Sequence, residues 1–336
     1  MFSYPVPMPL LTSPFNEIFS VHKDSFDLLA IEIFQYQAIN NPVYKEYLDY
    51  LDINALEVKK VSEIPFLPIE LFKNHKILSG NTDPEMIFES SGTTGSIPSR
   101  HYIADLEIYQ KSIEKGFRHF FGDPSEYVFL ALLPSYLERN NSSLVYMVQH
   151  LMSLSDHEDN GFYLYDHDKL NNAIKRNSGS NKKIFFIGVS FALLDFAENY
   201  NPDLSKAVIM ETGGMKGQRR ELTRPELHDT LKQAFHTNNI MSEYGMAELL
   251  SQAYAKKEGY FETPEWMKFL VRDVNDPFCY IGNGQTGGLN VIDLANVNSC
   301  SFIASQDLGR IMDDGRIEIL GRFDNSDIRG CSLMYQ

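Results

Sequence analysis

The chain has few cysteines, no long hydrophobic run and no cluster of basic residues, and each absence narrows its possible functions. Among its 336 residues the cysteines are Cys279, Cys300 and Cys331. This odd number at wide spacing does not indicate a disulfide framework or a metal knuckle, and it favours a reduced, cytoplasmic location. No apolar run reaches the ~18 residues that a membrane span requires. The amino terminus lacks the basic and apolar regions of a signal peptide.

The charge balance argues against a further class of function. Lys and Arg together number 30, against 45 Asp and Glu, which gives a formal net charge of −15. Binding to nucleic acid requires clustered Lys and Arg that neutralise phosphates, and the sequence contains no such cluster. Hydrophobic residues make up 43% of the chain, which is enough for a large core. The length allows one large domain or two smaller ones.

The hydrophobic pattern divides the chain into three parts. Residues 1–85 carry apolar residues at helical spacing, as in SFDLLAIEIFQYQAI, and predict a helical segment packed on the core. Residues 86–260 alternate short apolar strands with helices, which predicts an α/β core with a mostly parallel sheet covered by helices. Residues 261–336 contain strands joined by glycine turns. There we expect a smaller antiparallel β layer and a tail that carries Cys331.

A loop rich in hydroxyl groups and glycine follows the apolar stretch MIF. Glycines let backbone N–H groups turn toward an anion and the hydroxyls add donors, a composition that suits a triphosphate. No Lys-Ser or Lys-Thr pair follows the loop, so it is not the P-loop of the common nucleoside triphosphatases. A polar surface turn would have the same composition. The candidate phosphate-binding residues are Ser90, Ser91, Gly92, Thr93, Thr94 and Gly95.

A second glycine-rich turn, ETGGMKG, ends a buried strand. Ligands of open α/β sheets bind beyond the carboxyl ends of the strands. Gly213 and Gly214 would admit a flat base or a ribose close to the backbone, and Lys216 would neutralise a phosphate. Glycine-rich turns between a strand and a helix are common, so an ordinary turn explains this motif equally well.

Three shorter motifs carry side chains that suit the rest of a nucleotide. In SEYGMAE, Tyr244 and Gly245 can lie against an aromatic base, and Glu248 can hold Mg²⁺ near phosphates. In QDLGRI, Asp307 can accept hydrogen bonds from both ribose hydroxyls, and in GRFDNSDIRG, Arg322 can reach the ribose or the α-phosphate. Taken singly, solvated residues and β-turns with a salt bridge account for each motif.

In this order, the five motifs resemble those of the adenylate-forming superfamily of acyl and aryl ligases, from residue 88 to the end of the chain. The resemblance implies that the chain uses ATP and Mg²⁺, activates a carboxylate as an acyl-adenylate and releases pyrophosphate. It also implies the large N-terminal domain of that superfamily. We expect the small mobile C-terminal domain of larger relatives to be absent.

Longer stretches narrow the resemblance to the LuxE family, the acyl-protein synthetases of bacterial fatty-acid reductase complexes. These stretches include IPFLPIELFK, FESSGTTGSIPSRHYI, ETGGMKGQRRELTRPELH and RGCSL. The resemblance implies a fatty acid as the substrate, Cys331 as the acyl acceptor and an acyl-CoA reductase-type protein as the partner. Tyr136 and Ser142 are expected to border the acyl pocket. Cys279 and Cys300 have apolar, strand-like neighbours and are expected in the core.

Two positions depart from the superfamily pattern. Ser99 and Arg100 follow Pro98, where the superfamily usually has a lysine, so that Arg100 is the candidate substitute for that charge. Ala247 stands where threonine is usual, which removes a hydroxyl near the phosphate. Two other functions therefore remain open. One is a ligase of the phenylacetate–coenzyme A type, and the other is an inactive scaffold subunit of a reductase complex.

Overall fold

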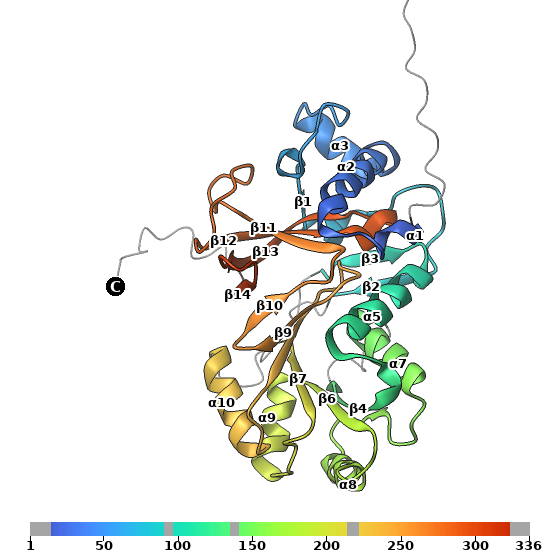
Figure 1. Cartoon of the computed structure of the whole chain (residues 1–336). Coiled ribbons are helices and arrows are strands. Elements are labelled where there is room, and N and C mark those ends of the chain that lie inside the picture. Colours follow the sequence, from blue (N-terminus) through green and yellow to red (C-terminus); the bar gives the residue numbers. More distant parts are fainter. Residues whose placement is uncertain (1–14, 91–96, 135–140, 214–221, 323–336) are drawn as a thin grey trace, which may run out of the picture.

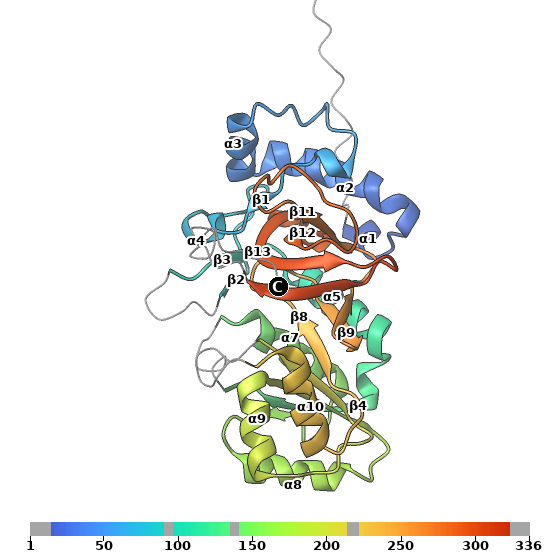
Figure 2. The same cartoon turned by 90° about the vertical axis from the view of Figure 1, so that its left-hand side faces the viewer.

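The computed structural model describes residues 15–90, 97–134, 141–213 and 222–322, which form one long sheet with helices packed around it (Figure 1). Figure 2 shows the N-terminal helices at one end of the molecule and the helices of the central part at the other. The described strands belong to this sheet, apart from two that form a separate hairpin. The predicted α/β fold is therefore confirmed.

The central part of the chain supplies the parallel portion of the sheet. Its strands lie in the order β5 (Gly161–Phe162), β4 (Tyr127–Leu132), β6 (Lys183–Val189), β7 (Val208–Thr212) and β8 (Met241–Tyr244). Neighbours in this order pair in parallel. Every residue of β4 is buried, as expected for a strand that helices cover on both faces.

Helices precede or connect these parallel strands and cover both faces of the sheet. They are α5 (Leu106–Phe121), α7 (Ser143–Ser155), α8 (His167–Asn177), α9 (Ser190–Asn199) and α10 (Arg224–Ala234). Figure 1 shows α9 and α10 on one side of the strands and α5 and α7 on the other. Helix α10 begins after Thr223, whose side chain accepts a hydrogen bond from the Glu226 N–H, as expected for an N-cap residue.

The C-terminal strands continue the same sheet in antiparallel fashion. Beyond β8 the order runs through β9 (Ala253–Lys257), β10 (Tyr260–Glu262), β14 (Ile317–Arg322), β13 (Phe302–Ile311), β12 (Gly287–Asp293) and β11 (Met267–Arg272). The direction changes where β8 pairs antiparallel with β9. The predicted antiparallel layer is thus confirmed, and it shares a hydrogen-bonded edge with the parallel portion.

The described part of the N-terminal segment contains several helices. It contains α1 (Phe15–Ile18), α2 (Lys23–Asn40), α3 (Pro42–Tyr50), the 3₁₀ turn η1 (Val61–Glu63), the short strand β1 (Leu67–Pro68) and α4 (Leu71–Asn74). Strand β1 pairs in parallel with β13. Phe34 of α2 packs edge-on against both Tyr44 and Phe302, with ring centroids 5.9 Å apart in each case. The segment therefore shares its core with the antiparallel strands.

A separate two-stranded sheet follows the N-terminal segment. Strand β2 (Met86–Glu89) pairs antiparallel with β3 (Arg100–Ile103). The apolar stretch MIF thus forms a strand as predicted, but its partner is the strand just beyond the hydroxyl-rich loop. This hairpin brings the two ends of that loop together.

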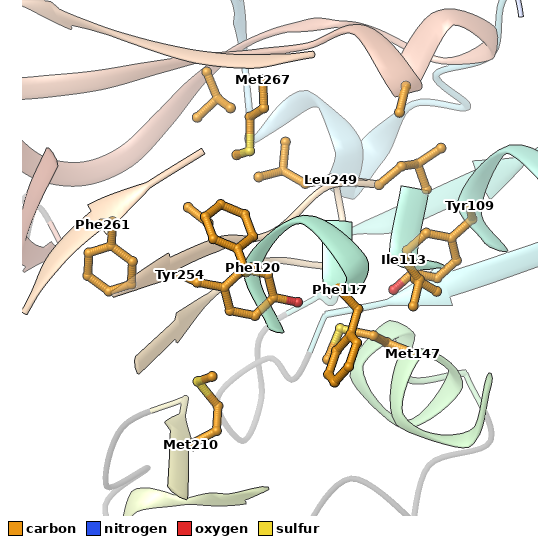
Figure 3. Close-up of a cluster of buried hydrophobic side chains, with 14 of the residues drawn as sticks. Tyr109, Ile113, Phe117, Phe120, Met147, Met210, Leu249, Tyr254, Phe261 and Met267 are labelled. Atoms are coloured by element: carbon orange, nitrogen blue, oxygen red, sulfur yellow. The ribbon is translucent and has the colours of Figure 1, made fainter. Parts of the chain in front are cut away.

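Aromatic side chains fill the space between α5 and the sheet (Figure 3). Phe120 lies 5.1 Å from Tyr254 between ring centroids, and Phe117 lies 5.5 Å from Phe129. Both Phe117 and Phe120 lie on the buried face of α5, because the buried residues of this helix recur at helical spacing. Within the described ranges, none of the helices is both long and apolar enough to cross a membrane.

The two described cysteines differ in exposure. Cys300 is fully buried, as predicted, whereas Cys279 is exposed, so its expected place in the core is wrong. Cys279 lies in the turn that joins β11 to β12. In this turn the Asp273 and Asp276 side chains accept hydrogen bonds from nearby backbone N–H groups. These local bonds favour a turn over a strand.

Candidate functional site

Two serines close the base of the hydroxyl-rich loop. The Ser99 N–H donates to Ser90 Oγ over 2.9 Å, and the Ser90 N–H donates to the Ser99 carbonyl over 3.0 Å. The Glu89 N–H next to them donates to the Asn141 carbonyl at the start of α7. The other candidate phosphate-binding residues lie outside the described residues; they are Ser91, Gly92, Thr93, Thr94 and Gly95.

Glu248, the candidate Mg²⁺ ligand, lies next to Ser99 at the end of this loop. Its side chain is 4% exposed and shares a hydrogen bond with Ser99. Burial raises the pKa of the Glu248 carboxyl, and the Ser99 hydrogen bond and the charge of Arg322 oppose this rise. A carboxylate is a suitable ligand for a hard cation such as Mg²⁺, which binds through one or two carboxylates together with phosphate oxygens.

Three predicted site residues meet where β8 lies near β13 and β14. The Tyr244 hydroxyl donates to Asp307 Oδ2 over 2.7 Å. Arg322 stands directly opposite Asp307 in the strand register, with 3.8 Å between its Nε and Asp307 Oδ1. Burial raises the pKa of Asp307, and Tyr244 and Arg322 act in the opposite direction. The sequence motifs around residues 244, 307 and 322 thus form one cluster.

The backbone favours glycine at Gly213, and a side chain at Gly245 would displace a neighbouring carboxylate. Gly213 has a φ of +72°, in the region that residues with side chains seldom adopt. At Gly245 a Cβ would lie only 2.5 Å from Glu243 Oε1. Gly214 and Lys216, which belong to the same candidate nucleotide site, lie outside the described residues.

The sequence analysis missed a group of buried polar residues beside Gly213. The Thr212 hydroxyl donates to Glu243 Oε2 over 2.5 Å. Burial raises the pKa of Glu243 to about 7, and the negative charge of Glu211 adds to the effect. Burial also opposes ionisation of Glu211, but hydrogen bonds from His228 and Ser242 and the charge of Arg224 outweigh it and lower the Glu211 pKa.

A signal for this group exists in the sequence. Glu211 follows three apolar residues in the short run VIMET and Glu243 stands in the short run MSEY, and an unpaired carboxylate buried in either strand would be costly. Because adjacent parallel strands bring their carboxyl ends to one edge, the two strands could have been expected to share partners there.

The remaining predicted residues show no shared arrangement. Ser142 caps α7, since its side-chain oxygen accepts a hydrogen bond from the Val145 N–H, which is a structural role. The Arg100 guanidinium is paired with Glu89 across the hairpin, with 3.1 Å between Nε and Oε1. Tyr136 and Cys331 lie outside the described residues, so the structure does not place the candidate acyl pocket or acyl acceptor.

Comparison with known proteins identifies the fold. No protein-family model and no curated protein matches the sequence. Among solved structures, a 2-hydroxyisobutyryl-CoA ligase in complex with 2-HIB-AMP and CoA is similar over 95% of this chain and 75% of its own, with 13% identity and a TM-score of 0.65.

Two further structures cover less of their own length. ATP-bound MatB from Rhodopseudomonas palustris is 15% identical over 70% of this chain and 47% of its own, with a TM-score of 0.55. A long-chain-fatty-acid-CoA ligase (FadD1) from Archaeoglobus fulgidus is 16% identical over 70% and 51%, with a TM-score of 0.53. The chain thus spans about half the length of these two proteins, and it has the fold of adenylate-forming ligases.

Proposed function

We propose that the protein activates a carboxylic acid with ATP and forms an acyl-adenylate. The observation that supports the proposal is the proximity of the described candidate residues, since Tyr244, Asp307 and Arg322 meet and the charges of Arg322 and Asp307 act on Glu248. Ser90 and Ser99 close the loop, Glu248 lies against Ser99, and Tyr244 and Asp307 are hydrogen-bonded to each other. On the fold of adenylate-forming ligases, this arrangement suits a nucleotide whose phosphates point toward the loop and whose ribose points toward Asp307.

Each residue of the cluster has a chemical task in this proposal. Asp307 accepts hydrogen bonds from the ribose hydroxyls, and Arg322, 80% exposed beside it, contacts the ribose or the α-phosphate. Tyr244 packs near the base, and the loop from Ser90 holds the β- and γ-phosphates. Glu248 fits as the carboxylate ligand of Mg²⁺, which neutralises phosphate charge when bound.

The proposed reaction has two steps with balanced atoms. In the first, a carboxylate oxygen of the acid attacks the α-phosphorus of ATP, the bond to the bridging oxygen breaks, and pyrophosphate leaves. In the second, the sulfur of Cys331 attacks the acyl carbonyl, the thiol proton is lost to water, and AMP leaves. We further propose that the acid is a fatty acid and that a partner acyl reductase receives the acyl group.

Pyrophosphate exchange tests the first step. With ATP, Mg²⁺ and a panel of fatty acids of different length, at least one acid should drive incorporation of labelled pyrophosphate into ATP. The Asp307→Ala variant should lose most of this exchange, because a charged acceptor for the ribose is removed. No exchange with any carboxylic acid would overturn the proposed activity.

Intact-mass measurement tests the second step. After incubation with ATP and the active fatty acid, the wild-type chain should gain the mass of one acyl group. Cys331→Ala should keep the exchange reaction and gain no acyl group, whereas the exposed Cys279→Ala should behave as wild type. Equal acylation of Cys331→Ala would remove this cysteine from the mechanism.

A second candidate function is the ligation of the acyl group to free coenzyme A. The names of the similar structures favour it, since a 2-hydroxyisobutyryl-CoA ligase and a long-chain-fatty-acid-CoA ligase are among them. Coenzyme A consumption by the Cys331→Ala variant, at the rate of the wild type, would favour this function over transfer to the protein's own cysteine.

A further inference from the structure

The segment that carries Glu248 has no regular secondary structure of its own. Residues 245–252 belong to neither a helix nor a strand, although Glu248 and its next three neighbours are buried. Buried backbone N–H and C=O groups require hydrogen-bond partners, and those of a helix or strand find them in neighbouring backbone. Within the segment the Leu249 N–H donates to the Met246 carbonyl over 3.1 Å, and side chains from other elements bind several of the remaining groups.

Four of these backbone groups are bound by three side chains. The Ala247 carbonyl lies 2.8 Å from His101 Nδ1, which must carry the proton because a carbonyl only accepts. The Glu248 carbonyl accepts from Asn296 Nδ2 over 2.9 Å. The N–H groups of Leu250 and Ser251 donate to Asp293 Oδ2 over 2.8 and 2.9 Å. His101, Asp293 and Asn296 are each fully buried.

Asn296 is in turn held by the N-terminal segment. It lies in the 3₁₀ turn η3 (Leu294–Asn298), against which α2 packs. Gln37 of α2 is fully buried, and its Nε2 donates to the carbonyls of Asn296 and Val297 over 2.9 and 3.0 Å. Its Oε1 accepts from the Ser301 N–H. A continuous chain of hydrogen bonds therefore runs from α2 through η3 to the backbone of Glu248.

We propose that Asn296 and Gln37 are positioning residues, which hold the backbone of Glu248 so that its carboxylate faces the Mg²⁺ of a bound magnesium–ATP complex. The inference rests on the function proposed above. Side chains that orient metal ligands typically change metal affinity by roughly 10–100-fold when they are removed. Asn296 and Gln37 lie far from Glu248 in the sequence and do not touch the nucleotide in this arrangement.

The chain contains its own reporter for this segment. Trp266 is the single tryptophan, and its Nε1 donates to Ser251 Oγ over 2.8 Å. Ser251 Oγ also donates to Asp293 Oδ1 over 2.6 Å. If the binding of magnesium–ATP changes the environment of residues 245–252, the fluorescence of Trp266 should change. This measurement does not depend on catalysis.

The test measures ATP affinity with and without Mg²⁺ by calorimetry and by Trp266 fluorescence. Wild type should bind ATP more tightly with Mg²⁺ than with EDTA. Asn296→Ala should weaken the binding of Mg²⁺ to the ATP complex by about tenfold and leave the affinity for ATP in EDTA unchanged. Glu248→Gln should show the same pattern with a larger loss.

Two further variants keep the test decisive. Gln37→Met removes the hydrogen bonds from Gln37 to the Asn296 and Val297 carbonyls and keeps the size of the side chain. It should weaken Mg²⁺ binding by less than Asn296→Ala does. It replaces Asn296→Ala if that variant does not fold. Asn177→Ala is the matched control, because Asn177 is a buried asparagine whose amide bonds to Asp159 and to the Ala173 carbonyl, away from Glu248. It should destabilise the fold without changing the Mg²⁺ dependence.

The outcomes separate this inference from the function on which it rests. Wild-type protein that binds ATP with a normal Mg²⁺ dependence, together with unchanged dependence in Asn296→Ala and Gln37→Met, would overturn the positioning role alone. A parallel loss in Asn177→Ala would also overturn it, since the effect would then follow stability. Wild-type protein that binds no ATP in either condition would overturn the proposed function and this inference together.

Discussion

Asp307 is the residue to which the proposed nucleotide site assigns the ribose. Its Oδ2 accepts from Tyr244 and its Oδ1 faces Arg322, so that both oxygens lie at the junction of three strands. A carboxylate in such a place can exchange these partners for the two hydroxyls of a ribose. In the proposed nucleotide site, Asp307 would therefore recognise the sugar rather than the base.

This leads to a prediction on nucleotide selectivity. Wild type should bind ATP more tightly than 2′,3′-dideoxy-ATP by about tenfold or more, because hydrogen bonds to a charged group contribute roughly 1.5–3 kcal/mol each. Asp307→Ala should bind the two nucleotides equally, as measured by calorimetry. Asp314→Asn, in the exposed turn between β13 and β14, is the control and should keep the preference. A preference that persists in Asp307→Ala would place the ribose elsewhere.

His101 gives a prediction on pH. Burial lowers the pKa of this imidazole from 6.5 to about 4, and the Ala247 carbonyl opposes the shift only in part. Between these values the unfolded chain binds a proton that the folded chain does not bind. The free energy of unfolding should therefore fall as the pH falls from 6.5 to 4, by on the order of 3 kcal/mol from this group.

Urea denaturation at several pH values measures this contribution. His101→Gln, which does not titrate, should lose less stability than wild type over the same range, even if it is less stable at pH 7. Carboxyl groups titrate equally in both proteins, so the difference between the two curves isolates the imidazole. Parallel curves would show that His101 takes up a proton in the folded state.

At the scale of elements, the start of α10 is defined by a reciprocal pair of hydrogen bonds. Thr223 accepts from the Glu226 N–H, and the Glu226 carboxylate accepts from the Thr223 N–H over 2.8 Å. The helix follows the segment that contains Gly214 and Lys216 in the sequence. Its first turn also contains Arg224, whose guanidinium faces Glu211 in the polar group beside Gly213.

Removal of this cap should cost stability in a measurable amount. Thr223→Ala should lower the free energy of unfolding by about 1 kcal/mol, the usual cost of losing a threonine cap. Thr230→Ala is the control on the same helix, since its hydroxyl bonds only to the Glu226 carbonyl within the helix, and it should change stability by less than about 0.5 kcal/mol. Equal losses in chemical denaturation would contradict the capping role.

The elements that the sequence predicted best are those with local signals. The fully apolar run of β4, the helical spacing in α5 and the cap of α10 each depend on residues close together in the chain. The pairing of β2 with β3 and the exposure of Cys279 were missed, because strand partners and turns depend on backbone bonds that the apolar pattern does not encode.

The candidate site likewise contains features that the sequence predicted and features that depend on residues far apart in the chain. Motif order predicted that Tyr244, Asp307 and Arg322 would serve one ligand, and the structure brings these three together. The contacts of Gln37 with η3 could not be predicted, since they join residues 259 and more positions apart. Glu243 was missed because its hydrogen-bond partner, Thr212, lies 31 residues away on the neighbouring strand.

At the scale of the whole molecule, the N-terminal segment is part of the core. Phe34 is fully buried against Tyr44 and Phe302, which belong to different parts of the chain. We therefore expect the segment and the antiparallel strands to unfold together. Trp266 fluorescence and circular dichroism should report one coincident transition in denaturant.

Phe34→Ala should lower the stability of the entire protein by about 3–5 kcal/mol, the usual cost of truncating a buried phenylalanine. The transition should stay coincident by both probes. Leu28→Ala, on the exposed side of the same helix with 64% exposure, should change little. A variant in which circular dichroism is lost well before the Trp266 signal changes would show that the N-terminal helices unfold as a separate unit.

The hydrogen-bonded seam between β8 and β9 has a mechanical consequence. Tyr244 stands on one side of this seam and Asp307 on the other, yet both belong to one unbroken sheet. The strands that carry these two residues cannot separate as two domains would, because separation would break the backbone hydrogen bonds between paired strands. If a nucleotide binds here as proposed, a relative movement of Tyr244 and Asp307 would have to bend this continuous sheet rather than separate two parts of it.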